Sequence, residues 1–391
     1  MKAGLAIRPA PTMARRPPRE TRLAADAAPA LAQARKPFPE GQAAHPIDGL
    51  RMQATVRTKG PSVRTLIFGG AGFVGLNIAE ALLQAGHDVL AFDRSPIPDA
   101  ALRSFAGLPG AFTAIRGDVT DEAAVGAAMG QGTELVVMGA AITAGRERDA
   151  TDPATTLKVN LLAQVPILAA ARAAGVRRVV NLSSAAAYGA AGERLPELDE
   201  TTPGDPVGLY AITKWASERV GARLGDLWGL DVVSLRLSGV FGPWEHATGV
   251  RDTLSPHCQI LAAAAGGQPA ILPRPGLRDW IYAPDVADAV LAVAAAQKPG
   301  HGVYNVSTGR RFTLLDWGQR LAQAFPGFIC RLAEPGEAAT IDFHGPSDRA
   351  PMAVARIAHD IGWSAQTEGL ASADRLAAWW HTHGRTMETG R

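Results

Sequence analysis

The chain has 391 residues, of which 47% are hydrophobic and 19% charged, and its formal net charge is +2. This is the profile of a soluble protein with one large domain or two lobes, and it argues against a nucleic-acid-binding surface. No apolar run reaches about 18 residues without a charge, so a membrane-spanning helix is not expected.

The first 60 residues differ from the rest. They contain MARRPPRETR and ARKPFPEGQAAHP, which are rich in Arg, Pro and Ala and have no hydrophobic periodicity. Such a segment cannot bury enough apolar surface to offset the entropy lost on ordering. The pair Arg15 and Arg16 is not followed by an apolar stretch, so it does not indicate an export signal. We expect a disordered basic arm over 1–60; the alternatives are an organelle-targeting peptide or a functional start at Met52.

From residue 64, short apolar segments alternate with helical ones. An amphipathic helix is predicted over 71–87. Strands are predicted over 64–70, 88–93, 112–118, 134–141, 177–184 and 229–242. Buried strands separated by helices of about 10 to 20 residues indicate βαβ units, and hence a parallel sheet covered on both faces.

The alternation ends near residue 242, where Pro- and Gly-rich connections begin. A short helix is predicted in PSDRAPMAVARIAHDIGW and a terminal helix in LASADRLAAWWHTHG. The predicted fold class is therefore α/β. We expect a doubly wound, parallel-sheet Rossmann domain over 61–242 and a smaller mixed α/β C-terminal lobe over 243–391, part of which returns to the sheet. Such sheets bind ligands at the carboxyl ends of their strands.

The stretch FGGAGFVG places Gly69, Gly72 and Gly75 after the first strand and at the start of the first helix. Glycine permits a tight turn and lets the backbone approach a pyrophosphate, while the helix N-terminus offers free N–H groups. Asp93 ends the next strand, where a carboxylate binds ribose hydroxyls and repels a 2′-phosphate. The pattern predicts a dinucleotide site that favours NAD over NADP, although Arg94 follows the acid directly.

Two further strand ends have residues suited to a cofactor. Asp118 in RGDVTD could meet the adenine amino group, or it could cap the following helix. Ala140 and Ala141 in MGAAIT would let the backbone lie flat against a cofactor, or they could serve close packing.

Tyr210 and Lys214 are four residues apart in GLYAITKWASE, so both leave the same face of a predicted helix. A phenol has a pKa near 10, which is too high for a base at neutral pH. An adjacent ammonium and an oxidised nicotinamide ring both favour the phenolate, so the pair is typical of a tuned acid/base. Ser183 and Ser184 end a strand and offer a hydroxyl to the substrate oxygen. The alternative is a core tyrosine beside a solvated lysine.

These motifs together resemble those of the extended short-chain dehydrogenases/reductases, in the NAD-dependent epimerase/dehydratase family, and especially its UDP-glucose 4-epimerase-like members. The resemblance spans about residues 64–383. The matching segments are GGAGFVG, GDVTD, GAAIT, KVN, SSAAAYG, YAITK, LRLSGVFGP, RDWIYAPDVADAV and YNVSTG.

The resemblance implies roles for individual residues. Tyr210 would be the catalytic base, and Lys214 would lower its pKa while holding the nicotinamide ribose. Ser184 would be the hydroxyl partner, and Asn160 would position the site through its helix.

It also implies contacts for both ligands. It implies that the backbone of Phe73 and Val74 contacts the pyrophosphate of the cofactor. Asp118 and Val119 would hold the adenine. Arg278 would bind phosphates of the substrate, unless it forms a salt bridge with Asp279 or Asp285.

Two departures bear on the reaction. Ala185 and Ala186 stand where dehydratases of the family have an acidic pair, so elimination of water is not expected. Gly239 in LRLSGVFGP stands where nucleotide-sugar epimerases often have Asn or Thr near the diphosphate. The GVFGP form also resembles hydroxysteroid-type and other alcohol dehydrogenases.

The predicted function is that of a cytoplasmic, NAD-dependent enzyme acting on a sugar-type substrate, with no metal, nucleic acid or membrane as partner. The first expectation is a nucleotide-sugar 4-epimerase that works by transient hydride transfer. The alternative is an NAD-dependent dehydrogenase or reductase of a sugar, sugar acid or other alcohol, and a non-catalytic dinucleotide sensor is a third class.

Two predictions concern surfaces. The loop over 243–257, with His246, Arg251 and His257, would choose the substrate through anionic groups, or it would be solvated. The helix that holds Tyr210 and the one near 160–175 are apolar enough for the homodimer that is usual in the family. Cys258 and Cys330 are far apart without metal-ligand spacing, which fits a reducing cytoplasm.

Overall fold

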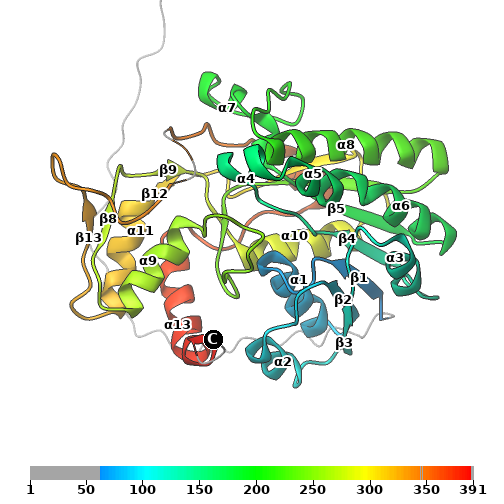
Figure 1. Cartoon of the computed structure of the whole chain (residues 1–391), viewed down its shortest axis with the longest axis horizontal. Coiled ribbons are helices and arrows are strands. Elements are labelled where there is room, and N and C mark those ends of the chain that lie inside the picture. Colours follow the sequence, from blue (N-terminus) through cyan, green and yellow to red (C-terminus); the bar gives the residue numbers. More distant parts are fainter. Residues whose placement is uncertain (1–61, 344, 346, 389–391) are drawn as a thin grey trace, which may run out of the picture. The chain divides into compact units, whose positions relative to one another are not determined.

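The computed structural model describes residues 62–343, 345 and 347–388, so the predicted arm lies outside the described residues. Its centre is a seven-stranded sheet in the order β11-β6-β5-β4-β1-β2-β3 (Figure 1), in which all pairings are parallel. The strands are β1 (Arg64–Phe68), β2 (Asp88–Asp93), β3 (Phe112–Arg116), β4 (Leu135–Met138), β5 (Arg178–Ser184), β6 (Val232–Leu237) and β11 (Val303–Val306). The predicted fold class is confirmed.

Helices cover both faces of the sheet because its central strands are apolar on both sides. One face packs against α1 (Phe73–Gln84), α2 (Asp99–Phe105), α10 (Ala283–Ala295) and α12 (Ala355–Ile361). The other packs against α3 (Glu122–Ala128), α6 (Gln164–Ala173) and α8 (Leu209–Trp228). Neighbouring strands β1 and β4 lead to opposite faces, so their connections diverge and leave a crevice at the carboxyl edge.

A helical stretch that is interrupted at Asp152 precedes β5. It consists of α4 (Arg146–Thr151), α5 (Pro153–Leu157), a π-helical turn (Lys158–Leu162) and α6. Within the described residues, Pro153–Ala173 is the stretch with the length and hydropathy of a membrane span, and 39% of it is buried. The buried part packs against α3 and α8, so the stretch also serves as a core helix of this domain.

The predicted strand over 229–242 is wrong in its second half. β6 ends at Leu237, and β7 (Val240–Phe241) pairs with β10 (Ile281–Tyr282) in a separate sheet. Beyond Leu237 the chain leaves the large sheet, and the Ser238 hydroxyl donates to the carbonyl of Asp279 at 2.7 Å.

The C-terminal lobe has its own apolar core. It comprises α9 (Pro256–Ala265), α11 (Leu314–Leu321), a 3₁₀ turn (Ala322–Ala324), α13 (Ala371–Glu388) and three strand pairs. These are β7 with β10, β8 (Ala270–Leu272) with β13 (Cys330–Leu332), and β9 (Leu277–Arg278) with β12 (Phe312–Thr313). A further short helix, α7 (Ala191–Arg194), follows a 3₁₀ turn over Ala185–Tyr188. Between these elements β11 returns to the large sheet; the domain boundary near 242 stays a prediction.

Candidate active site

The turn after β1 is shaped by its glycines. Gly69 has a φ of +86°, which disfavours any side chain. A Cβ would lie 2.6 Å from the Ala140 nitrogen if placed on Gly69, and 2.2 Å from the Gly69 oxygen if placed on Gly75. Gly72 is the N-cap of α1 and no side chain caps the helix, so the N–H groups of Phe73 and Val74 face an uncapped end. Such an end attracts a pyrophosphate.

A pocket of about 540 Å³ lies beside this turn. Its lining combines the turn with the carboxyl ends of the neighbouring strands. The lining residues are Gly69, Gly72, Asp93, Arg94, Gly117, Asp118, Val119, Gly139, Ala140, Ala141, Val159 and Val250. The structure thus brings to one pocket the residues predicted at the ribose and the adenine, together with Ala140 and Ala141.

The two acids of the pocket are held by backbone and hydroxyl groups. Asp93 accepts the N–H of Ala71 at 3.1 Å and that of Ser95 at 2.8 Å, which ties it to the glycine turn. Asp118 accepts the N–H and the hydroxyl of Thr120, both at 2.8 Å. These bonds, with the charge of Arg94, lower the pKa of Asp118.

Asp118 is therefore not the helix cap that the sequence left open. The N-cap of α3 is Asp121, whose carboxylate accepts the N–H groups of Ala123 and Ala124. Asp118 is free to line the pocket instead.

Asn160 connects the loop after β4 to α8. Its side chain accepts the N–H of Ile142 at 2.7 Å, and donates to the Ile142 oxygen at 2.9 Å and the Thr213 hydroxyl at 3.2 Å. It lies in the π-helical turn, a geometry that is frequent at functional sites. Since Thr213 precedes Lys214, Asn160 fixes the helix at the predicted catalytic residues.

Tyr210, Lys214 and Ser184 come together at the ends of α8 and β5. The Lys214 ammonium donates to the Leu182 oxygen at 2.7 Å and lies 5.8 Å from the centroid of the Tyr210 ring. Ser184 ends β5, and its hydroxyl acts on the Tyr210 phenol by lowering the pKa of Tyr210. Lys214 is buried, so the alternative of a solvated lysine is wrong.

The electrostatics of this group differ from the expectation. Burial raises the pKa of Tyr210, while the hydrogen bond from Ser184 and the charge of Arg251 lower it. Burial lowers the pKa of Lys214 to about 8, and the charge of Glu218 opposes that shift. Lys214 is not among the groups that shift the pKa of Tyr210; among the described residues, Arg251 is a cation whose charge lowers it.

Sequence reasoning missed an ion pair beneath these residues. Glu218 follows Lys214 by four positions in α8 and binds Arg236 of β6 through two bonds, at 2.9 and 2.7 Å. The Ser183 hydroxyl also donates to Glu218, and the Arg236 guanidinium lies 4.6 Å from the Tyr188 ring centroid. A charged residue within the apolar segment VVSLRL was the available signal.

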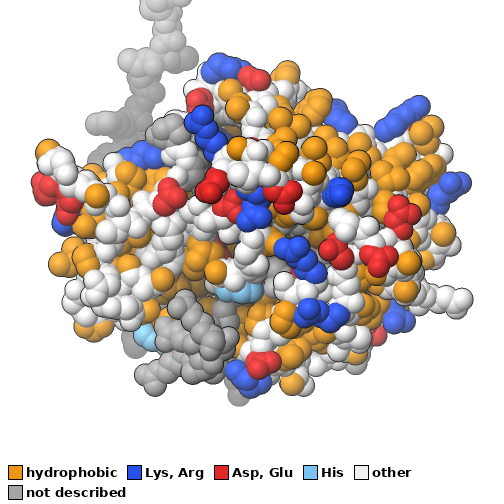
Figure 2. All heavy atoms as spheres, viewed as in Figure 1, with side chains coloured by type: hydrophobic (Ala, Val, Ile, Leu, Met, Phe, Trp, Pro, Cys, Tyr) orange, Lys and Arg blue, Asp and Glu red, His pale blue; other side chains and the backbone are white. Residues whose placement is uncertain are grey.

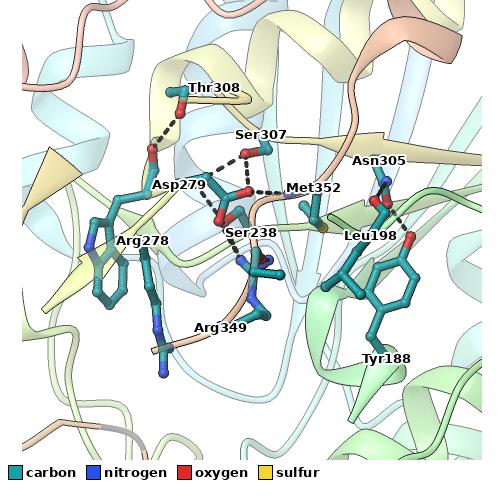
Figure 3. A network of polar contacts seen from close by, with 12 residues as sticks. Tyr188, Leu198, Ser238, Arg278, Asp279, Asn305, Ser307, Thr308, Arg349 and Met352 are labelled. Atoms are coloured by element: carbon teal, nitrogen blue, oxygen red, sulfur yellow. Dashed lines mark hydrogen bonds and ion pairs between the residues drawn. The ribbon is translucent and has the colours of Figure 1, made fainter. Parts of the chain in front are cut away.

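On the side of the C-terminal lobe, buried Asp279 is the centre of a polar network (Figure 3). It accepts bonds from the hydroxyls of Ser238 and Ser307, from the N–H of Met352 and from the guanidinium of Arg349. Ser238 and Ser307 directly follow β6 and β11. The network thus lies at the carboxyl edge, next to the strand that ends at Ser184.

Arg278 is not paired with either predicted acid. Asp279 binds Arg349, and Asp285 accepts the N–H groups of Gln366 and Thr367. In Figure 3 the guanidinium of Arg349 enters the network, whereas that of Arg278 points away from it.

The Arg278 guanidinium is a cation with unused donor capacity. It lies 5.3 Å from the Trp280 ring centroid and donates to the Ser347 oxygen at 2.9 Å, while its buried Nε has no partner. Burial, with the charge of Arg349 next, lowers its pKa to about 10, so it stays cationic at neutral pH. An anion that reaches it would satisfy the Nε.

Gly239, which departs from the Asn or Thr of many epimerases, lies against the ring of Trp280. A Cβ on Gly239 would lie 2.4 Å from the Trp280 ring. The indole therefore occupies the space into which a side chain at 239 would extend, and no amide anchor fits there.

The loop over 243–257 is only partly as expected. His257 lies in α9, fully buried and stacked on Phe241 with ring centroids 3.6 Å apart. It is therefore a core residue rather than a candidate for substrate anions, because aromatic side chains of the lobe close around it. Arg251 is the residue of this loop whose charge acts on Tyr210.

Comparison with known proteins supports one assignment. Residues 65–307 match the NAD dependent epimerase/dehydratase family, which is more than half of the chain. The chain belongs to this family.

Individual relatives of the NAD-dependent epimerase/dehydratase family are distant. The UDP-glucose 4-epimerase of Mycolicibacterium smegmatis is 27% identical over 318 residues, which cover 79% of this chain and 96% of that protein. The UDP-glucose 4-epimerase of Thermus thermophilus, in its complex with NAD, has a TM-score of 0.65 at 28% identity, covering 82% of this chain and 99% of that one. MoeE5 in complex with UDP-glucuronic acid and NAD has a TM-score of 0.65 at 25% identity over the same shares.

The cofactor of the NAD-dependent epimerase/dehydratase family is NAD, as predicted. The residues present fit it, because a Cβ at Gly69 or Gly75 would fill the cradle beside the uncapped α1 terminus. Asp93 faces the same pocket, where a carboxylate selects against a 2′-phosphate.

Proposed function

We propose that the chain is an NAD-dependent nucleotide-sugar 4-epimerase. The observation that supports this proposal best is that the two groups expected to bind the substrate lie at the same edge of the large sheet. Ser184, Ser238 and Ser307 follow or end the adjacent strands β5, β6 and β11, so the Tyr210 group and the Arg278 side of the lobe lie at one carboxyl edge. The sugar of a substrate could contact Tyr210 and Ser184 while its diphosphate binds Arg278.

In this proposal Tyr210 takes the proton of the sugar hydroxyl and Ser184 hydrogen-bonds the same oxygen. NAD held by the turn after β1 and by Asp93 would supply reversible hydride acceptance at the carbon, so that the reaction would have no net redox change. Lys214 orients the nicotinamide ribose from its fixed place on Leu182. Ala185 and Ala186 offer no acid for elimination, which favours epimerisation over dehydration.

Arg278 would anchor the diphosphate. Its buried Nε lacks a partner, and Arg274, which pairs with Asp348 at 3.1 Å, adds a second cation nearby. Charge-assisted bonds from guanidinium to phosphate are the strong kind and are often bidentate.

Replacing Tyr210 with Phe tests the assignment. We expect turnover to fall by about 10²- to 10⁴-fold, the usual contribution of a positioned acid/base, with NAD affinity retained. The protein is mixed with NAD and a panel of UDP- and dTDP-hexoses, and chromatography of the sugars is combined with absorbance at the band of reduced nicotinamide.

The matched control is Tyr304→Phe. Tyr304 is a buried tyrosine whose hydroxyl bonds Asp360 of α12, outside this group, so turnover should persist. Epimer formation that survives Tyr210→Phe would contradict the proposed base.

A dehydrogenase of a sugar or sugar acid is the second candidate. The indole of Trp280 over Gly239 favours it, because that space lacks the amide of many nucleotide-sugar epimerases. Steady accumulation of reduced cofactor with a substrate lacking a nucleotide would support this candidate over the first.

A further inference from the structure

The segment Trp244–Ser255, named here the strap, joins β7 to α9. Its first end is fixed on α1, the helix that follows the glycine turn. The fully buried Trp244 donates its indole N–H to Glu80 of α1 at 2.8 Å. The Asn77 side chain, also in α1, donates to the Pro243 oxygen at 2.8 Å. The strap therefore starts from the β1 side of the crevice.

The two ends of the strap are tied to each other. Glu245 is buried and accepts the N–H and the hydroxyl of Ser255, both at 2.6 Å. Between them, Arg251 forms an ion pair with Glu245 at 3.0 Å and donates to the Thr253 oxygen at 3.0 Å. A loop of this length whose ends meet and whose own side chains bond one another is an Ω-loop. Such a loop is a compact unit that can move as one piece.

The middle of the strap reaches the opposite side of the crevice. The Val250 oxygen accepts the N–H of Thr143 at 2.8 Å, in the loop that follows β4. Val250 also lines the cofactor pocket, so the strap forms part of its wall. Each of the residues 246–254 is half-buried or exposed. Polar attachments, rather than core packing, therefore hold this part in place.

The outermost of these attachments is an ion pair. Asp252 of the strap pairs with Arg148 of α4 at 2.6 Å and accepts the N–H of Gly145 at 2.8 Å. Arg148 also donates to the Gly249 oxygen at 3.1 Å. The side chains of Arg148 and Asp252 are 31% and 28% exposed, so water and salt reach the pair.

The helix on the other side of this ion pair is anchored independently. Asp149, next to Arg148 in α4, accepts the N–H of Leu209 at the start of α8 at 3.0 Å. Asp152, directly after α4, accepts the N–H of Thr155 in α5 at 3.2 Å. Because α4 is tied to two neighbouring helices, breaking the ion pair releases the strap rather than α4.

We propose that Arg148 and Asp252 form a clasp that closes the strap over the cofactor pocket, so that NAD enters and leaves when the clasp is open. The pocket lies between the turn after β1 and the loop after β4, and the closed strap connects these two sides. The inference goes beyond the proposed function, because it holds whatever substrate the chain converts.

The strength of the clasp suits a reversible closure. An ion pair that is partly exposed contributes little to stability, whereas a carboxylate that also accepts a backbone N–H is held more firmly. The clasp can therefore favour the closed strap and still open repeatedly during function.

A clasp of this kind differs from an ordinary cofactor contact in its effect on rates. A side chain that only contacts NAD changes the rate of release and leaves the rate of entry as it is. A closed strap limits both rates, because the free protein also populates the closed state. Opening the clasp should therefore accelerate entry and release together and change the affinity less than either rate.

The first test measures both rates by stopped-flow fluorescence, with NADH as the probe and excess NAD to displace it. We expect Arg148→Met and Asp252→Asn each to raise the entry and release rates by about 5- to 30-fold, since each removes charge-assisted bonds. Unchanged rates, or faster release with unchanged entry, would overturn the clasp.

The matched control is Arg331→Met. Arg331 of β13 pairs with Glu337 at 2.6 Å, and these side chains are 40% and 29% exposed. The control thus removes an ion pair of similar length and exposure from the C-terminal lobe, and both NADH rates should stay at their wild-type values.

The second test locks the strap with a disulfide. An ideal Cβ on Gly145 would lie 3.9 Å from the Asp252 Cβ, which is within the range that disulfides span. Gly145 has a φ of −89°, which any side chain can adopt. We expect the oxidised Gly145→Cys/Asp252→Cys protein to bind and release NADH at least about tenfold more slowly than its reduced form.

This comparison separates closure from folding, because the two forms share one sequence and differ in a single bond. Gly145→Cys alone should not respond to the oxidant, which excludes Cys258 and Cys330 as the cause. Equal rates in the oxidised and reduced double variant would overturn the clasp. Failure of the disulfide to form would place the strap away from α4 and would overturn it as well.

Discussion

Lys214 is a buried ammonium whose surroundings oppose its charge. Its pKa is lowered from 10.5 to about 8 by burial, with the charge of Glu218 acting in the opposite direction. Between these two values the folded protein binds fewer protons than the unfolded chain. The contribution of Lys214 to stability therefore increases as the pH rises through this window, and its penalty is largest below pH 8.

We expect this penalty to be measurable by urea unfolding. From pH 7.5 to pH 9.5, the unfolding free energy of wild type should rise by about 2 kcal/mol relative to Lys214→Met. Other groups that titrate in this range cancel in the difference. The exposed Lys298→Met variant should show no such trend relative to wild type; an equal trend in both variants would mean that Lys214 is well solvated.

At the scale of elements, the turn between β1 and α1 depends on contacts that admit no side chain. The Gly75 position lies against the Gly69 oxygen, so Gly75→Ala must widen the turn. We expect NAD affinity to fall by at least about tenfold, since a helix N-terminus binds pyrophosphate only at close range. Fluorescence or calorimetric titration with NAD measures the change.

Gly126→Ala is the matched control for this substitution. Gly126 is an exposed residue of α3 with no atom near the position of an added Cβ. Alanine there should leave NAD affinity unchanged and should stabilise the helix by about 0.5–1 kcal/mol. Equal NAD affinity in both variants would show that the turn tolerates a side chain.

At the scale of the whole molecule, the outward faces of α6, α8 and the π-helical turn before α6 are apolar. Leu162 is 59% exposed, Val165 44% and Ile212 38%. Figure 2 shows hydrophobic side chains gathered over the side where α6 and α8 lie in Figure 1. These exposed apolar side chains contribute to the hydropathy of Pro153–Ala173, and an exposed apolar patch is typical of an interaction surface.

We therefore expect a homodimer that is closed by these helices, as the sequence predicted. Sedimentation of wild type should give twice the mass of one chain, and Val165→Glu should shift the distribution to monomer. Leu332→Glu, at an equally apolar exposed position in β13 of the other lobe, should leave the dimer intact. A dimer that is unaffected by Val165→Glu would place the interface elsewhere.

Much of the fold followed from the sequence because its signals are local. The apolar segments at 64–70, 88–93 and 177–184 became strands, and the glycine turn lies where its spacing placed it. Tyr210 and Lys214 share a helix face because helical periodicity alone places residues four apart together.

The sequence by itself thus determined the α/β class, the family and the dinucleotide turn. Only the tertiary structure decided which groups surround each of these residues. It paired Arg349 rather than Arg278 with Asp279, buried His257 among aromatic rings, and filled the space over Gly239 with Trp280. Such contacts join residues distant in the chain. They depend on how the lobe packs on the sheet, which local spacing does not specify, and burial and charge at the site follow from that packing.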